Sequence, residues 1–399
     1  MKNRNRVFAF LLIMTILGLQ TRAQWSQKTH HSGFARYDFA GFSANGKGYM
    51  GGGRYAGPFN AISEWQEFDP VTDVWNVITP MPYPFTGLAA FGIGGYGYVS
   101  CGVNDAFFNY ETYKYNQAGN NWGTVTNMLY PRLYASTATV GSKGYIIGGY
   151  GFAAEPMNDI WEYNSLSDIW TEKTALPFDA ARYFATAFSV GSDVFVFGGT
   201  NYDGYLNDLW KFDTNLDQWF QMTSMPAETR FQSNSFVIGD TAYVVGGVTI
   251  SGTNLKEVWQ YEASSDTWSQ LPDFPGATGP FGGVSFVIDE KGYIVTGNGT
   301  KECWEFDPYW SVNVPENESS LGLSLYPNPV INESVVTIPA NGSKSFVVGI
   351  TNSYGRLVKT MKTSGNRLTV DRDEFTCGVY FLRVQDEFLR TGALKFIVL

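Results

Sequence analysis

The sequence repeats with a period close to fifty residues, and this repeat constrains the fold more than any other feature. Two runs, "NDIWEYNSLSDIW" at 158–170 and "NDLWKFDTNLDQW" at 207–219, share an acid, an aromatic residue and a closing tryptophan at the same offsets. Five units close on Trp75, Trp122, Trp170, Trp219 and Trp268, and the matching acids are Glu64, Glu111, Asp159, Asp208 and Glu257. A repeat of this length predicts that each unit is one supersecondary structure that packs against its neighbours.

A second repeated element is a strand-like run that begins with an aromatic residue and ends in glycine. Runs such as "YIIGG" and "YVVGG" start at Tyr49, Tyr98, Tyr145, Phe195, Tyr243 and Tyr293. Each unit then holds four strand-sized pieces, and the piece before the glycine run is rich in small residues, which suits strands crowded around an axis. The unit resembles the kelch repeat. That resemblance implies an all-β fold, a six-bladed kelch-type β-propeller over residues 24–307.

The sixth unit lacks its closing tryptophan. It contains Tyr293 and the acid Glu302, but no tryptophan follows at the expected place, whereas Trp25 lies fifty residues before Trp75. Trp310 breaks the spacing and is assigned to the linker. We therefore expect the N-terminal strand around Trp25 to complete the sixth blade, so that no sheet edge is left open there.

The two ends of the chain carry export signals. Residues 1–23 combine basic residues, a short apolar run and "TRA", which predicts a cleaved signal peptide. A polar linker is expected at residues 308–320. The alternating runs that follow predict a small C-terminal β-sandwich over residues 321–399. There, "LYPNPV", "SYGRLV", "GVYFLRV" and "LKFIVL" resemble the type A sorting domain of the Bacteroidetes type IX secretion system. This implies passage through that machinery to the medium or the outer cell surface, with release or anchoring left open.

Composition argues against several kinds of site. The formal net charge is −10, and it falls to −14 once the four basic residues of 1–23 are removed, so nucleic acid is a poor partner. No transmembrane segment is expected in the mature chain. The cysteines Cys101, Cys303 and Cys377 lie in separate segments and are expected to be buried free thiols. The only histidines, His30 and His31, are adjacent and are expected to lie in an exposed loop, so no metal, cofactor or catalytic residue is predicted.

One repeated position suggests where a ligand could bind. Thirteen residues before the strand-leading aromatic stand the candidate ligand-binding residues Arg36, Arg132, Arg182 and Arg230, with Phe85 and Pro280 in the other two blades. We expect these arginines around one mouth of the central channel. In the alternative, each pairs with a repeated acid and ties blades together. The aromatic residues that follow three of them, Tyr37, Tyr183 and Phe231, are assigned to the core.

Three functions are compatible with this pattern. The first is a secreted or cell-surface module that recognises an extracellular glycan or protein through the propeller loops and the channel mouth. The second is an enzyme on acidic sugars similar to kelch-type sialic acid mutarotases, in which the arginines would hold a carboxylate. The third is a structural envelope component. A copper oxidase like galactose oxidase, which also carries kelch-type repeats, would need two histidines from different blades, and the adjacent pair does not provide them.

Overall fold

The computed structural model describes residues 24–55, 60–104, 107–297, 299–308, 321–339, 342–343, 345–352, 357–375, 378–387 and 390–398. This part of the chain is built of β-strands, with two short 3-10 helices, η1 (Phe178–Ala180) and η2 (Arg372–Glu374). It divides into two compact units, the propeller (Trp25–Asp307) and a C-terminal unit that holds Pro308–Leu399. None of its helices is long and apolar enough to cross a membrane. The predicted signal peptide (1–23) and all of the predicted linker except Pro308 lie outside the described residues.

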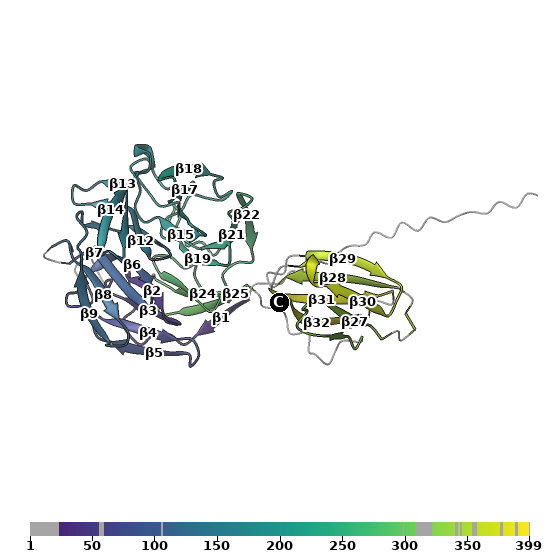
Figure 1. The fold of residues 1–399 in the computed structure, drawn as a ribbon. Helices are drawn as coiled ribbons and strands as arrows, with labels where there is room; N and C mark the ends of the chain where they lie inside the picture. The colour runs from purple at the N-terminus through teal and green to yellow at the C-terminus, as the bar shows by residue number, and fades with distance from the viewer. Residues whose placement is uncertain are drawn as a thin grey trace, which may run out of the picture. The chain divides into compact units, whose positions relative to one another are not determined.

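Antiparallel sheets, the blades, follow one another around the propeller, and the first strands of the blades lie toward its centre (Figure 1). Blade one consists of β2 (Ala40–Ala44), β3 (Lys47–Gly51), β4 (Trp65–Asp69) and β5 (Val74–Ile78). Blade two consists of β6 (Thr86–Ile93), β7 (Tyr96–Val103), β8 (Thr112–Asn116) and β9 (Asn121–Val125). Blade three adds a short strand and consists of β10 (Arg132–Leu133), β11 (Ser136–Val140), β12 (Lys143–Gly151), β13 (Pro156–Asn164) and β14 (Ile169–Lys173).

The remaining three sheets continue the series. Blade four consists of β15 (Thr186–Val190), β16 (Asp193–Phe197), β17 (Leu209–Asp213) and β18 (Gln218–Met222). Blade five consists of β19 (Asn234–Ile238), β20 (Thr241–Val245), β21 (Val258–Glu262) and β22 (Thr267–Leu271). Blade six consists of β23 (Val284–Ile288), β24 (Lys291–Val295), β25 (Cys303–Asp307) and the N-terminal β1 (Gln24–Lys28).

Strand β1 forms the outer edge of blade six, where the tryptophan spacing predicts it. The strand order of that sheet is β1-β25-β24-β23, and β1 lies beside β25 in Figure 1. The Trp25 ring packs against Phe236, Phe274 and Phe306, with ring centroids 6.4, 5.1 and 4.9 Å away. Lys28 adds an ion pair to Glu305 at 3.1 Å. The first and last strands of the propeller therefore share one sheet.

Hydroxyl groups on the innermost strands link neighbouring blades near the axis. Side chains of Thr137, Ser189, Ser235 and Ser285 donate hydrogen bonds of 2.5 to 3.2 Å to main-chain carbonyl groups of the preceding blade, those of Ala90, Thr139, Ala187 and Ser235. Short side chains let the strands approach closely enough for these bonds. The same crowding explains Gly97, where a Cβ atom would lie 1.9 Å from the Phe42 ring of blade one.

The closing tryptophans link the blades at their outer strands. The Trp75 indole donates to the carbonyl oxygen of Thr29 at 2.9 Å, and the Thr29 amide donates to Asp73 at 3.0 Å. The same pair of bonds recurs for Trp122, Trp170, Trp219 and Trp268 with Thr79, Thr126, Thr174 and Thr223 and with Asn120, Asp168, Asp217 and Asp266. Each closing tryptophan thus packs within its own blade and hydrogen-bonds to the blade before it.

The C-terminal unit is a sandwich of two sheets with its own core. One sheet is β26 (Ser324–Tyr326), β27 (Glu333–Thr337) and β30 (Arg367–Asp371); the other is β29 (Leu357–Thr363), β28 (Phe346–Asn352), β31 (Gly378–Asp386) and β32 (Thr391–Val398). Buried side chains such as Val336, Val348, Leu382 and Phe396 fill the space between the sheets. Because this core is separate, the unit has the internal packing of an independent domain.

Candidate recognition site at the channel mouth

Six residues, one in each blade at the start of the innermost long strand or just before it, form a ring that we call the ring mouth. They are Asp38, Gly87, Tyr134, Phe184, Gln232 and Gly282, and all six have φ between 53° and 69°, in the left-handed region. From the second blade to the sixth, the amide of each ring residue donates to the carbonyl oxygen of the ring residue before it, over 2.9 to 3.2 Å. This backbone conformation recurs in every blade and is therefore a feature of the fold. The side chains at the six positions, by contrast, differ from blade to blade.

The four predicted ligand-binding arginines lie two residues before the ring and point into the blades. Arg36, Arg132, Arg182 and Arg230 are at most 1% exposed. Each forms an ion pair with the repeated acid of its own blade: Glu64 at 2.6 Å, Asp159 at 2.5 Å, Asp208 at 2.8 Å and Glu257 at 2.6 Å. The alternative that pairs each arginine with a repeated acid describes this geometry, although the pairs lie within blades rather than between them. A ligand-binding role for the four arginines stays a prediction, and the geometry gives it no support.

The buried arginines satisfy main-chain groups as well as acids. Arg182 donates to the carbonyl oxygens of Ala180 at 2.8 Å and Gly198 at 3.2 Å, in addition to both oxygens of Asp208. Burial alone would raise the pKa of Asp208, but the Arg182 guanidinium outweighs it and the pKa is lowered. In blade two, which lacks the arginine, Asn109 donates to the carbonyl oxygens of Cys101 and Glu111 instead. Arg182 and Asn109 stand at different positions, but each therefore joins the glycine turn of its blade to the repeated acid of that blade.

The ring mouth contains a pocket of about 180 Å³. Its walls are ring residues and their neighbours from five blades: Tyr37, Asp38, Arg54, Tyr134, Phe184, Gln232, Phe281 and Gly282. The expectation that Tyr37, Tyr183 and Phe231 belong to the core was wrong, because all three are only half-buried and Tyr37 lines this pocket. They pair with the loop after the glycine turn, Tyr37 with Arg54, so strand alternation does not place them inside the blade.

Polar side chains in the pocket are held in one hydrogen-bonded group. Arg54 Nε donates to Asp38 Oδ2 at 2.8 Å, and Gln232 Nε2 donates to Asp38 Oδ1 at 3.2 Å. Burial raises the pKa of Asp38 even though Arg54 opposes it. Burial also raises the pKa of Tyr134 to about 12, with a smaller contribution from the charge of Asp38. The pocket thus presents aromatic rings around a carboxylate that already has a cationic partner.

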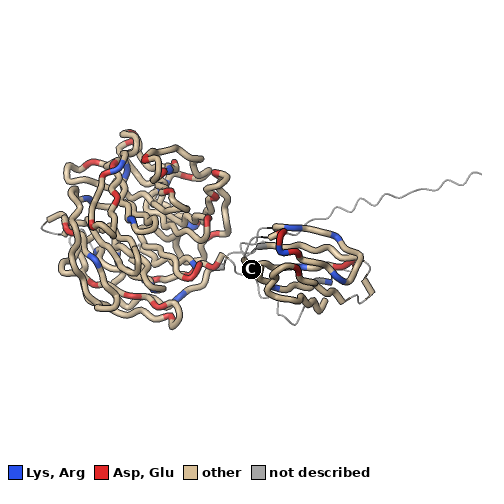
Figure 2. The backbone as a smooth tube through the Cα atoms, in the orientation of Figure 1, with Lys and Arg blue, Asp and Glu red and all other residues tan. Residues whose placement is uncertain are grey.

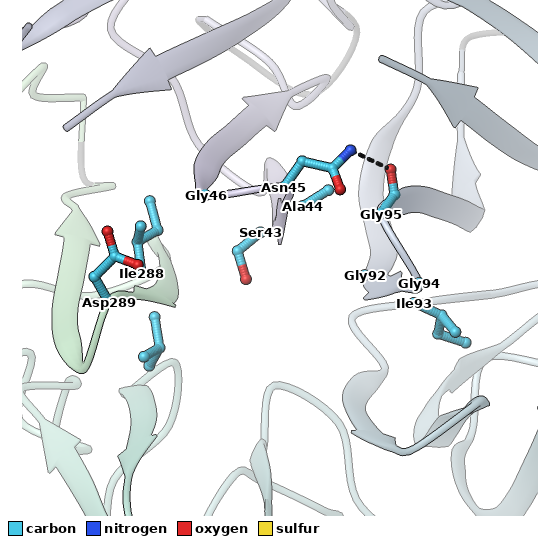
Figure 3. A pocket seen from close by; sticks show the side chains of 11 residues that line it. Ser43, Ala44, Asn45, Gly46, Gly92, Ile93, Gly94, Gly95, Ile288 and Asp289 are labelled. Atoms are coloured by element: carbon cyan, nitrogen blue, oxygen red, sulfur yellow. Dashed lines mark hydrogen bonds between the residues drawn. The ribbon is translucent and has the colours of Figure 1, made fainter. Parts of the chain in front are cut away.

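A larger cavity, of about 260 Å³, lies at the opposite end of the innermost strands, which we call the turn mouth (Figure 3). It is lined by the ends of β2, β6 and β23 and by their turns. Among the described lining residues, eight are glycine, alanine, valine or isoleucine, and Asp289 is the one with a charged side chain. The Asn45 amide already donates to the Gly95 carbonyl oxygen and to Gln117 Oε1. This lining offers few groups for recognition, so the ring mouth is the better candidate.

The loops around the ring mouth form a face that we call the ring face, and exposed aromatic side chains gather on it. The group comprises Phe34, Tyr55, Tyr83, Phe107, Tyr110, Tyr130, Phe152, Phe178 and Tyr202, each at least 45% exposed. The turns at the other end of the described blades form a face that we call the turn face. Its exposed apolar residues are mainly aliphatic, such as Val71, Leu166 and Leu216. Acidic and basic residues are interspersed over the propeller rather than gathered by sign (Figure 2). Exposed aromatic side chains with mixed charges around them are typical of recognition surfaces.

The histidines and cysteines give no metal centre in the described chain. His30 is exposed as expected, but the prediction for His31 was wrong: it is 2% exposed and packs against Trp75 at a centroid distance of 6.1 Å. Cys101 and Cys303 are buried free thiols, whereas Cys377 lies outside the described residues. No group of three His, Cys, Asp or Glu side chains in the described ranges could hold a metal ion.

His31 should make the propeller sensitive to mild acid. Burial, together with the charges of Arg36 and Lys301, lowers the pKa of His31 to about 3 from 6.5. Below pH 6.5, His31 therefore binds a proton in the unfolded chain but stays neutral in the folded chain. The contribution of His31 to the free energy of unfolding is fully present above pH 6.5 and is lost progressively as the pH falls toward 3. Between pH 7 and pH 5 we expect the native chain to lose about 2 kcal/mol more than His31→Gln. Urea unfolding at the two pH values measures this; His30→Gln should behave like the native chain, and an equal loss in His31→Gln would contradict the assignment.

Comparison with known proteins identifies both units. A family model described as the KLHDC2/KLHL20/DRC7 Kelch-repeats domain matches residues 87–298 and, in a second alignment, 134–349. Similar curated proteins are an F-box/kelch-repeat protein of Arabidopsis thaliana (24% identical over 148 residues; 32% of this chain, 31% of the relative), Kelch-like protein 25 of Xenopus tropicalis (26% over 117 residues; 29% and 20%) and Beta-scruin of Limulus polyphemus (25% over 202 residues; 48% and 21%). The matched segments span less than a third of each of these relatives.

The C-terminal unit matches a different family model. Residues 324–398 match the Secretion system C-terminal sorting domain. This match confirms the predicted location, the cell surface or the extracellular space, reached by type IX secretion. A kelch propeller joined to a sorting domain fits a secreted protein-binding module.

Proposed function

Because this chain belongs to the kelch-repeat family and ends in a secretion sorting domain, we propose that it recognises an extracellular protein through the ring face of its propeller. The observation that carries the proposal is the gathering of exposed aromatic side chains on the ring face. Tyrosine and phenylalanine are enriched in protein interfaces because they bury a large area at little cost in side-chain entropy. The turn face offers mainly isolated aliphatic residues, which are ordinary on a soluble surface.

Paired variants on the two faces test this proposal. Phe152→Ser with Tyr202→Ser removes rings that are 78% and 76% exposed on the ring face, and Leu166→Ser with Leu216→Ser is the matched control on the turn face. All four residues are exposed, so neither pair should alter folding by more than about 1 kcal/mol. The readout is the native size of the secreted full chain in culture medium and cell-surface extracts.

We expect the native chain and the turn-face pair to run in a complex, and the ring-face pair to run as free protein. A complex that survives the ring-face substitutions would refute the proposal, as would a native chain that forms no complex with any other protein.

Removing the sorting domain should stop the chain before the cell surface. The C-terminal unit has its own core, so a chain ending at Ser320 keeps every propeller strand. We expect this shortened chain to fold and to stay in the periplasm, because the segment that addresses it to the second export step is gone. Immunoblots of periplasm, outer membrane and medium measure the distribution. Normal amounts of the shortened chain in the medium would contradict this expectation.

A further inference from the structure

The ring-mouth pocket is sized for one ring-shaped group. Its volume of about 180 Å³ is below the roughly 300–1,000 Å³ of pockets that hold drug-sized ligands. It therefore suits the end of a larger ligand or a single small ring. The pocket lies on the axis, where residues from five blades converge, so an extended molecule could place one unit in it and continue over the ring face.

Aromatic rings and unpartnered polar atoms line the pocket together. Tyr134 and Phe184 stack on each other with centroids 3.9 Å apart, and Tyr37 and Phe281 supply two further rings. Within the described residues, the Tyr134 hydroxyl has no hydrogen-bond partner, and the Gln232 side chain uses only its amino group, toward Asp38. A ligand with apolar C–H faces and several hydroxyl groups could pack on the rings and bond to these free atoms.

The charges of the pocket favour an uncharged ligand. Asp38 is paired with Arg54, and its side chain is only 5% exposed, so the two formal charges cancel where the ligand would sit. An acidic or basic ligand would bring a charge into a half-buried site that offers no opposite charge without breaking this pair. Aromatic rings, free hydroxyl and amide groups and no net charge are together what a neutral sugar requires. We infer that the ring-mouth pocket binds one neutral pyranose residue of a glycan.

This site does not depend on the proposed protein partner, and the two can be tested apart. Saturation-transfer NMR on the full chain would use methyl glycosides of glucose, galactose, mannose and N-acetylglucosamine as probes. N-acetylneuraminic acid and lysine methyl ester serve as charged comparators. We expect at least one neutral glycoside to bind and the charged comparators not to bind.

Conservative variants then place the bound sugar. Tyr134→Phe removes the hydroxyl and keeps the ring, so it should weaken affinity about fivefold to tenfold without a change in melting temperature. Gln232→Met removes the amide and keeps the length; it should weaken affinity by a similar factor and also lower the melting temperature, because the buried Asp38 carboxylate loses a donor. Asp289→Asn at the turn mouth and the ring-face pair Phe152→Ser with Tyr202→Ser should leave affinity unchanged. The inference is overturned if no neutral glycoside binds, if a charged comparator binds better, or if the double variant Tyr134→Phe with Gln232→Met binds as the native chain does.

Discussion

Deleting β1, residues 24–28, from the mature chain is expected to destabilise the propeller more than any single substitution. The deletion uncovers the hydrogen-bonding edge of β25 and removes the Trp25 ring from Phe236, Phe274 and Phe306. Loss of a packed tryptophan alone costs about 3–5 kcal/mol, and the open edge also invites aggregation. Urea unfolding of the purified chain, followed by tryptophan fluorescence, measures the change.

A milder variant controls for the length of the chain. Trp25→Phe keeps a ring against the same three partners and should cost less than half as much as the deletion. If the deleted chain unfolds at the same urea concentration as the native chain, β1 does not complete blade six in solution.

Arg182→Ala is expected to cost about 3–5 kcal/mol, because it leaves the Asp208 carboxylate without its buried partner. The carbonyl oxygens of Ala180 and Gly198 lose their donor as well. Lys143→Ala is the matched control: Lys143 is paired with Glu162 at 2.9 Å but is 40% exposed, so its loss should cost at most about 1 kcal/mol. Thermal and urea unfolding of both variants measures the difference.

The alternative outcome would revive the ligand hypothesis for the arginines. If Arg182→Ala melted like the native chain and lost binding to an acidic sugar or acidic peptide, the ion pair would be dispensable and the guanidinium would serve recognition.

The repeat made the blades predictable because every blade packs in the same way, so the same residue types recur at the same spacing. The spacing from Trp25 to Trp75 gave the place of the N-terminal strand, since a residue with the same neighbours in every blade must recur at one period. The same logic could have found the links between blades. A threonine four residues after each tryptophan, as in Thr79 and Thr126, makes the bonds that join the blades, and only Pro272 departs from the series.

The candidate site was harder to predict because its residues follow no chemical pattern. The repeated arginines were the most conspicuous candidates. However, each recurs together with its acid in four blades, because the pair has a structural role in the blade. The variable position two residues later carries the pocket: Asp38, Tyr134, Phe184 and Gln232 share a backbone conformation and differ in everything else. Sequence spacing could mark that position, but not the pairing of Asp38 with Arg54, which depends on the path of the loop after the glycine turn.

Photo-cross-linking in the secreting cells is the most direct test of recognition through the ring face. A benzophenone amino acid replaces Phe152, which is 78% exposed on the ring face, or Leu166, which is 83% exposed on the turn face of the same blade. The proposed function predicts a discrete adduct between the secreted chain and another protein from position 152 and none from position 166. Adducts from position 166 alone, or none from either position, would contradict it.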